Sequence, residues 1–273
     1  WALPLPFTMG YDIAGIVVSV GEGVENLKEG DAVFGVNWGD GSHNVDGGPV
    51  GGTFKEYVTV KASVLSKRPD GCPPDKAAAV ALGGTTAYQA LFECLQLKKD
   101  DRVLILGASG AVGQLAVQLA KEAGAWVAAT CSSRTVDFVK TTCAPDLIIN
   151  YREQKWWEVP EVKDVDAVFA SVAEETPWTH AKKVLKQGGR YCSIADQECG
   201  FDPTGHAEEG YPFASFLCLS SNTQQQDKLA QHVADGKLNV VVDKVWPFTE
   251  EGVREALAKQ NSGTSMGKNV IKF

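Results

Sequence analysis

One stretch of the chain, RVLILGASGAVGQLAVQLAKEAGAWVAAT at residues 102–130, limits the possible folds more than any other. Residues 103–106 form a short aliphatic run, which is typical of a strand buried on both faces. From Val112 onward apolar residues recur at helical spacing, and Gly124 is expected to end that helix. A second β-rich run, WVAAT, follows at once. The order strand, glycine turn, helix and strand predicts one βαβ unit.

Three glycines at intervals of three join the first strand to the helix. Gly107 is expected to allow a sharp turn, Gly110 to let backbone approach a ligand, and Gly113 to let helix pack on strand. A helix start also presents N–H groups and the positive end of a dipole to an anion. An ordinary tight turn would account for the glycines alone. Because strand, helix and second strand surround them in register, the stretch favours a dinucleotide pyrophosphate as ligand.

The bulk composition narrows the class of protein. The chain has 273 residues, of which 44% are hydrophobic and 22% charged, as expected of a soluble globular protein with two domains. Its net charge of −8 disfavours nucleic acid and anionic membrane surfaces as partners. No apolar run approaches the ~18 residues that cross a bilayer, and no signal peptide is visible. Seven scattered cysteines without a C-x-x-C pair favour a reducing, cytoplasmic location over a disulfide framework or a structural zinc site.

From Arg102 the pattern alternates strand with helix, which predicts a parallel sheet wound on both faces. Short β runs return after Gly236 around one helix at 249–260, so a β-rich module is expected to be split by the parallel-sheet domain. The predicted strands of the sheet are 103–106, 126–130, 146–150, 166–170 and 190–194, with 216–220 as a sixth candidate.

The first part of the chain is predicted to be mostly β structure. Residues 9–65 contain aliphatic runs cut by glycine turns, and the alternating segment at 51–60 is expected to be a further strand. Residues 74–95 look helical at both ends, with a break expected at 83–86, where two glycines and two threonines occur.

The chain resembles the medium-chain dehydrogenase/reductase superfamily, in its zinc-independent quinone oxidoreductase (zeta-crystallin-like) branch. Six segments carry the resemblance in the family's order: MGYDIAGIVVSVGEGV, EGDAVFG, GTFKEYVTV, AAAVALGGTTAYQAL, LILGASGAVGQLAVQLAKEAGA and MGKNVIKF. The resemblance implies an α/β fold in which a Rossmann domain is inserted in a GroES-like catalytic domain, with the site in the cleft between them. The expected domains are 1–82 (catalytic, N-terminally incomplete against the family), 83–236 (Rossmann, NADP-binding) and 237–273 (return to the catalytic domain).

No metal is predicted. Zinc-dependent members of the superfamily use the histidine of a G-H-E motif, and here the matching segment is GYDIAG, with Tyr11 at that position. The region of the structural-zinc lobe reads NWGDGSHNVDGG, in which His43 and Asp46 are expected to be solvated loop residues rather than ligands. Without a Lewis acid, the preferred hydride acceptors are electron-poor quinones or α,β-unsaturated carbonyls.

The end of the second strand favours NADPH over NADH. An NAD site places an acidic residue about 20 residues beyond the glycines, on the ribose hydroxyls. Here Ser132, Ser133 and Arg134 occupy that neighbourhood, and the first carboxylate is Asp137. Hydroxyls and a guanidinium bind a 2′-phosphate through charge-assisted hydrogen bonds. The alternative is that Arg134 is only a solvated residue at a helix start.

Further cofactor contacts are expected at the carboxyl ends of the strands, where open parallel sheets bind ligands. Residues 171–172 and 194–195, which end the fourth and fifth strands, should therefore face the nicotinamide. The resemblance adds the threonine of TAY near the carboxamide, Tyr151 near the adenosine, and Lys268 near the phosphates or ribose. A core role for Tyr151 is equally open. The predicted cofactor residues are Thr85, Thr86, Gly107, Ser109, Gly110, Ala111, Val112, Gly113, Ser132, Ser133, Arg134, Tyr151, Ser171, Val172, Ile194, Ala195 and Lys268.

The sequence thus predicts an NADPH-dependent enzyme that reduces quinones or α,β-unsaturated carbonyls by hydride transfer, with a small molecule as partner and a homodimer formed through the Rossmann domain. Tyr11 and Trp38 are the candidates for lining the substrate pocket, although such residues more often serve in packing. No strong general acid is visible, so the proton is expected from solvent or a pocket hydroxyl. The alternatives are an enoyl-thioester reductase of the same superfamily and an NADPH-binding protein without turnover.

Overall fold

The computed structural model describes residues 8–37 and 52–273, and contacts between residues group the chain into two compact units. The first unit comprises 1–85 and 219–273, and the second comprises 86–218. The expected boundaries after residues 82 and 236 differ from this grouping, because residues 219–236 pack with the first unit. The extents of the functional domains stay a prediction.

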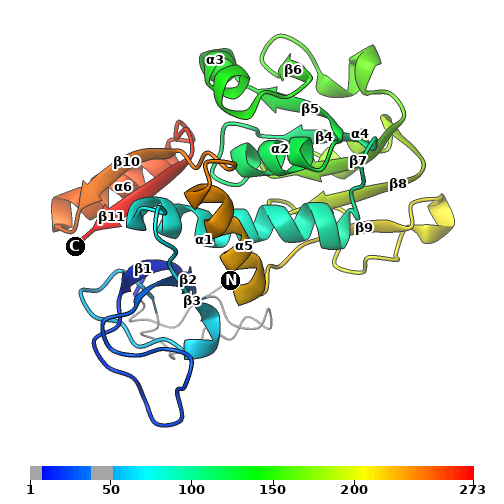
Figure 1. Cartoon of the computed structure of the whole chain (residues 1–273). Helices are drawn as coiled ribbons and strands as arrows, with labels where there is room; N and C mark the ends of the chain where they lie inside the picture. Colours follow the sequence, from blue (N-terminus) through cyan, green and yellow to red (C-terminus); the bar gives the residue numbers. More distant parts are fainter. Residues whose placement is uncertain (1–7, 38–51) are drawn as a thin grey trace. The chain divides into compact units, whose positions relative to one another are not determined.

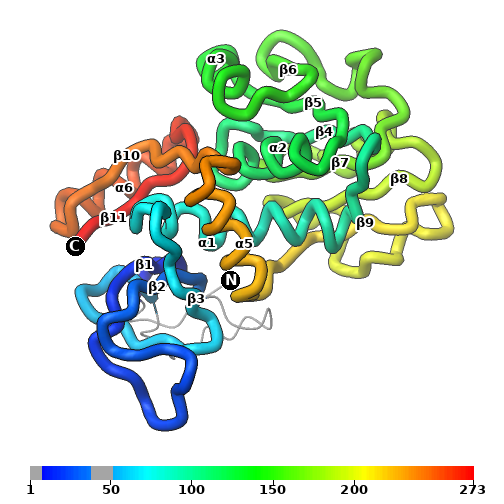
Figure 2. Tube along the Cα trace, viewed as in Figure 1, coloured from blue at the N-terminus to red at the C-terminus, as the bar shows by residue number. Residues whose placement is uncertain are grey.

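The second unit is built on a six-stranded sheet in the order β6-β5-β4-β7-β8-β9, with every neighbouring pair parallel (Figure 1). This is the predicted doubly wound sheet. Figure 2 shows the chain passing through these strands from blue-green at β4 to yellow at β9. The strands are β4 (Arg102–Leu106), β5 (Trp126–Cys131), β6 (Leu147–Asn150), β7 (Val165–Ala170), β8 (Leu185–Ser193) and β9 (Phe213–Phe216).

Side chains alternate between the two faces of the sheet along each strand. Both faces are covered by other parts of the second unit. On one face Leu104, Val168 and Tyr191 join a buried cluster with Trp156 and Trp178. The other face receives α2 (Gly113–Glu122) against β4 and β5, and the π-helical segment η3 (Gln89–Cys94) against β8. Apolar residues of α2 recur on one side and are fully buried, as the helical spacing predicts.

The sixth strand was expected at 216–220, and that prediction is wrong. The strand is β9, which pairs with β8 from Arg190 opposite Phe213 to Ser193 opposite Phe216. The apolar run FLCLS carries a strand-like composition, but its partner strand β8 ends at Ser193. A strand continues only where a neighbouring strand supplies hydrogen bonds.

The break predicted within residues 74–95 is also wrong. The helix α1 runs without interruption over Pro74–Tyr88 and continues directly into η3. A Cβ atom at Gly84 would lie 2.8 Å from Val80 Cγ2 and 3.1 Å from Leu229 Cδ1. The glycine therefore lets the helix α5 (Thr223–Ala234) pack closely against α1, and this packing outweighs the low helix propensity of glycine.

The first unit contains two small sheets. In one, β1 (Asp12–Ile16), β2 (Ala32–Val36) and β3 (Leu65–Lys67) are antiparallel around a core of Leu27, Val33, Val64 and Leu65. In the other, β10 (Val242–Pro247) and β11 (Lys268–Lys272) are parallel and flank α6 (Glu250–Asn261), the helix predicted near the C-terminus. The Thr249 hydroxyl accepts the Gly252 N–H at 3.1 Å and caps that helix.

The strand predicted at 51–60 is not found, since residues 52–60 form no regular strand. Backbone bonds join Thr53 N–H to the Gly10 carbonyl and Phe54 N–H to the Met9 carbonyl. After Phe54 the segment pairs with no strand, so its alternating side chains do not belong to a sheet. The remaining α-helices of the described chain are α3 (Val136–Phe138) and α4 (Pro177–Ala181). No helix in the described ranges is long and apolar enough to cross a bilayer.

Candidate functional site

The turn between β4 and α2 uses its three glycines in three different ways. Gly107 has a φ of +85°, and a Cβ atom there would overlap Val172 Cγ1. A Cβ atom at Gly113 would overlap the Gly107 carbonyl oxygen, so the helix packs directly on the end of the strand. At Gly110 a Cβ atom would meet nothing closer than the Gly107 oxygen at 3.5 Å. Space therefore remains beside the backbone at Gly110, where the sequence predicts a ligand.

The segments that follow β7 and β8 are fastened at the same edge of the sheet. The Ser171 hydroxyl donates to the Leu106 carbonyl at 2.6 Å, which ties the segment after β7 to the end of β4. Ile194 N–H donates to the Ala170 carbonyl at 3.1 Å and ties the end of β8 to β7. The structure thus brings residues 107–113, 171–172 and 194–195 together at the carboxyl edge of one sheet.

The residues predicted to select the dinucleotide follow β5 at the same edge. Ser133 and Arg134 are exposed, whereas Ser132 is buried and its hydroxyl lies 3.2 Å from Thr135 Oγ1. Asn150 Nδ2, at the end of β6, donates to the Ser133 hydroxyl at 3.2 Å. Ser133 and Arg134 are therefore free to face solvent or a ligand, while Ser132 is used in the local turn.

Tyr151 is 47% exposed, which excludes the core role that the sequence left open. Its N–H donates to the Cys131 carbonyl at 3.1 Å, so its backbone is fixed beside the end of β5. The guanidinium carbon of Arg152 lies 5.7 Å from the centre of the Tyr151 ring. Sequence reasoning missed both Asn150 and Arg152. A polar residue that ends the aliphatic strand LIIN was the available signal for Asn150.

A half-buried acid in the segment after β7 was also missed. The Trp156 indole N–H donates to Glu174 Oε2 at 2.8 Å. Burial raises the pKa of Glu174 above its usual value. Nothing in the sequence around Glu174 distinguishes it from a solvated glutamate, because its burial depends on a residue 18 positions earlier.

Thr85, Lys268 and Tyr11 belong to the first unit and are described there. Thr85 is fully buried, and its hydroxyl has no hydrogen-bond partner among the described residues. Lys268 Nζ lies 2.5 Å from Asp12 Oδ2, and Asp12 Oδ1 accepts the Leu82 N–H at 2.7 Å. The sequence did not predict that Lys268, expected near the cofactor, would be paired with a carboxylate.

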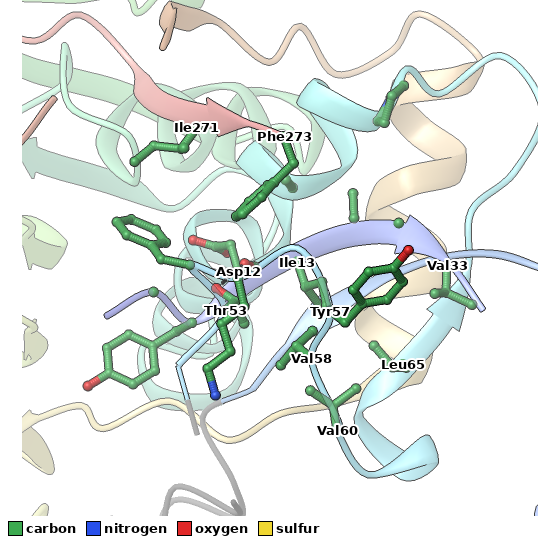
Figure 3. A pocket seen from close by; sticks show the side chains of 18 of the residues that line it. Asp12, Ile13, Val33, Thr53, Tyr57, Val58, Val60, Leu65, Ile271 and Phe273 are labelled. Atoms are coloured by element: carbon green, nitrogen blue, oxygen red, sulfur yellow. Dashed lines mark hydrogen bonds between the residues drawn. The ribbon is translucent and has the colours of Figure 1, made fainter. Parts of the chain in front are cut away.

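A groove of about 1570 Å³ lies within the first unit (Figure 3). Its walls are mostly aliphatic, and Tyr11 is among them; burial raises the pKa of the Tyr11 hydroxyl. Of the predicted site residues within the described ranges, Tyr11 and Lys268 line this groove. Trp38, His43 and Asp46 lie outside the described residues. Labelled wall residues in Figure 3 include Ile13, Val33, Val58, Val60, Leu65, Ile271 and Phe273.

Comparisons with known proteins agree with this architecture. Residues 1–70 match the family model of the alcohol dehydrogenase GroES-like domain, and residues 145–271 match that of zinc-binding dehydrogenases. The chain is 32% identical over 277 residues to the chloroplast envelope quinone oxidoreductase homolog of Arabidopsis thaliana, covering 96% of this chain and 78% of that protein. The chain belongs to the medium-chain dehydrogenase/reductase superfamily. The family and fold predicted from the sequence are therefore confirmed.

Other members of the superfamily are also similar. The chain is 34% identical over 272 residues to 2-methylene-furan-3-one reductase of Solanum lycopersicum, covering 98% of this chain and 64% of that protein. The solved structure of the quinone oxidoreductase from Coxiella burnetii aligns with a TM-score of 0.85 at 28% identity, covering 98% of this chain and 80% of that one. The chain thus spans less than two thirds of the tomato reductase's length.

Proteins of this superfamily use an NAD(P) cofactor, and the residues present fit a dinucleotide. The backbone at Gly110 leaves room for a pyrophosphate. One of the two family models is described as that of a zinc-binding dehydrogenase. Within residues 8–37 and 52–273, no three His, Cys, Asp or Glu side chains are grouped as metal ligands. Three histidines fall in these ranges, of which His180 stacks on Trp157 at 3.6 Å and His206 Nδ1 lies 2.8 Å from Glu209.

Proposed function

We propose that this chain binds NADPH at the carboxyl edge of its parallel sheet and reduces quinones or α,β-unsaturated carbonyls by hydride transfer, without a metal ion. The observation that carries the proposal is the turn after β4, where Gly107 and Gly113 permit the fold and Gly110 leaves space for a ligand. A glycine needed only for a turn would resemble Gly107, with positive φ and crowded surroundings. Gly110 has neither property.

Each end of the predicted cofactor has candidate residues. Backbone N–H groups of Ser109, Ala111 and Val112 lie at the start of α2, where the helix dipole favours a pyrophosphate. At the adenosine end, the exposed Ser133 hydroxyl and Arg134 guanidinium would bind a 2′-phosphate, and the exposed Tyr151 ring would lie against the adenosine. When bound, the dinucleotide supplies the hydride.

The acceptor class is supported by the names of two similar proteins, a quinone oxidoreductase homolog and a furanone reductase, and by Tyr11 at the position of the histidine that zinc-dependent members use. A conjugated carbonyl or quinone spreads the arriving negative charge over its own π-system, and a proton from solvent or a hydroxyl such as that of Tyr11 completes the reduction. Reduction of enoyl thioesters is the alternative substrate class. Cytoplasmic location and a homodimer remain predictions from the sequence.

The Gly110→Asp variant tests the binding site. A side chain would fill the space at Gly110, and its carboxylate would repel a pyrophosphate at a helix start. We expect the dissociation constant for NADPH to rise by about tenfold or more while the circular dichroism spectrum is unchanged. Gly21→Asp is the control for NADPH binding, because Gly21 is exposed, has open space around it, and is not among the residues predicted to bind the cofactor. Unchanged NADPH affinity in a folded Gly110→Asp protein would refute the binding site.

A further inference from the structure

The strand β1 is an edge of its three-stranded sheet. Among the strands of the described chain it pairs with β2 alone, from Asp12 opposite Val36 to Ile16 opposite Ala32. Natural edge strands usually carry a lysine, a proline or a bulge that prevents pairing with another chain. The segment 13–20, IAGIVVSV, contains no charged residue and no proline. This edge therefore lacks the usual protection.

The hydrogen bonds to β2 show which residues of β1 face the open side. Val17 N–H donates to the Asp31 carbonyl at 2.9 Å, and the Val17 carbonyl accepts the Gly30 N–H at 2.8 Å. Backbone groups of successive residues point to opposite sides of an antiparallel strand. Ala14 and Ile16 therefore direct their N–H and C=O groups away from β2. No hydrogen bond joins these groups to another segment of the described chain.

Exposed apolar side chains gather beside this open edge. Of the eleven large hydrophobic residues that are exposed in the described chain, seven line the groove of the first unit (Figure 3). They include Ile16, Val18, Val20, Tyr57 and Phe273. Ile16 and Val18 are 59% and 57% exposed. A contiguous exposed apolar patch of this kind marks an interaction surface.

The groove carries no net charge. Its charged lining residues are three acidic and three basic side chains: Asp12, Lys55, Glu56, Asp75, Lys268 and Lys272. Asp12 and Lys268 are paired with one another. The whole chain has a net charge of −8, so two copies repel one another in general. Contact across this groove brings no net charge together, and a second copy can approach here without that repulsion.

We propose that β1 pairs along its open edge with β1 of a second copy of this chain, antiparallel about a twofold axis. This symmetry places outward N–H groups of one strand opposite outward C=O groups of the other, so the same edge can pair with itself. Apolar side chains beside both strands leave water in the same step. The unpaired backbone groups favour a strand over an apolar small molecule, which would bury them without hydrogen bonds.

The pairing would join the two three-stranded sheets into one and consume the open edge, so association by this route stops at the dimer. Tyr11 lines the same groove, and the second copy would therefore form part of the wall beside this candidate substrate residue. The interface differs from the homodimer expected through the Rossmann domain. The pairing itself does not depend on NADPH binding or on hydride transfer.

The molecular mass and the amide exchange of the full chain test the pairing. Size-exclusion chromatography with light scattering measures the mass over a wide range of protein concentrations, and NMR measures hydrogen exchange at single amides. We expect a concentration-dependent dimer in which the N–H groups of Ala14 and Ile16 exchange at least about tenfold more slowly than in the monomer. The N–H groups of Ile13 and Gly15, which face β2, should be protected in both states.

Two variants locate the interface. Ile16→Lys places a charge on the open edge, and we expect the dissociation constant of the dimer to rise by at least about tenfold. Because this side chain is 59% exposed, the variant monomer should fold. Phe201→Lys is the matched control, since it makes the same kind of change at a residue of the second unit that is 54% exposed and packs on Phe216 of β9. It should keep the dimer.

Three results would overturn the proposal. A chain that stays monomeric at every concentration would leave the groove to an apolar small molecule or a different polypeptide. A dimer in which the Ala14 and Ile16 amides stay unprotected would use another surface. A dimer that is kept in Ile16→Lys and lost in Phe201→Lys would place the interface in the second unit. The first two results come from the unmodified chain, so the test does not depend on the variants folding.

Discussion

Arg134 is the residue on which the choice of dinucleotide depends. It is exposed beside the exposed Ser133, after a strand that ends without a carboxylate. We predict that Arg134→Glu weakens NADPH binding by about tenfold or more. The variant loses a charge-assisted hydrogen bond to the 2′-phosphate, and its carboxylate repels that phosphate. Binding of NADH, which lacks that phosphate, should be equal or tighter. Fluorescence titration with both dinucleotides measures the two affinities.

The control for this variant is Arg254→Glu, which makes the same change in net charge at an exposed position of α6. It should leave both affinities unchanged. If the unmodified protein binds NADH as well as or better than NADPH, the assignment of Ser133 and Arg134 to the 2′-phosphate is wrong.

At the residue scale, the sequence predicted positions whose reason is local. The roles of Gly107 and Gly113 follow from the strand and helix on either side, and the structure shows the positive φ and the close packing expected. Asn150 and the Lys268–Asp12 pair could not be predicted in the same way. Each depends on a partner supplied by a distant segment, and a single sequence gives no register for such contacts.

At the scale of elements, Asp146 joins the end of α2 to the start of β5. Its carboxylate lies 2.7 Å from Lys121 Nζ and accepts the Val127 N–H at 2.7 Å. Burial opposes ionisation, but the hydrogen bonds from Lys121 and Val127 outweigh it and lower the pKa of Asp146. These side chains are about one third exposed, so we expect Asp146→Asn to lower the free energy of unfolding by only about 1 kcal/mol at neutral pH.

The sign of the pH dependence follows from the lowered pKa. A carboxyl group with a lowered folded pKa stabilises the protein above its unfolded pKa of about 3.9, and this contribution is lost as the pH falls through the folded pKa. The difference in stability between wild type and Asp146→Asn should therefore shrink below about pH 4. Urea denaturation at several pH values measures it. A difference that grows on acidification would contradict the assignment.

The element-scale predictions succeeded where one local pattern decided the structure. The βαβ unit and α6 were found because their apolar periodicity agrees with the packing. The continuity of α1 was not predicted, because a glycine such as Gly84 usually weakens a helix. In the structure the missing side chain at Gly84 allows close contact with Leu229. The prediction of a strand at 51–60 was wrong, because an alternating pattern indicates a strand but does not supply the partner strand it needs.

For the whole molecule, we predict that the purified protein contains far less than one zinc atom per chain and that chelators leave its activity intact. Tyr11 occupies the position of the histidine used by zinc-dependent members, and no group of three ligands occurs within residues 8–37 and 52–273. Elemental analysis by mass spectrometry measures the number of zinc atoms per chain. About one zinc atom per chain, lost together with activity on chelation, would overturn the metal-free mechanism.

Turnover by the whole chain tests the central claim most directly. The protein is mixed with NADPH and each member of a panel of quinones, enones and enoyl thioesters, and the loss of NADPH absorbance is followed. We predict oxidation that requires a quinone or enone, is slower with NADH, and falls to background in Gly110→Asp. Consumption restricted to enoyl thioesters would select the other substrate class. Stoichiometric NADPH binding with no oxidation by any acceptor would contradict the proposal that this chain is an enzyme.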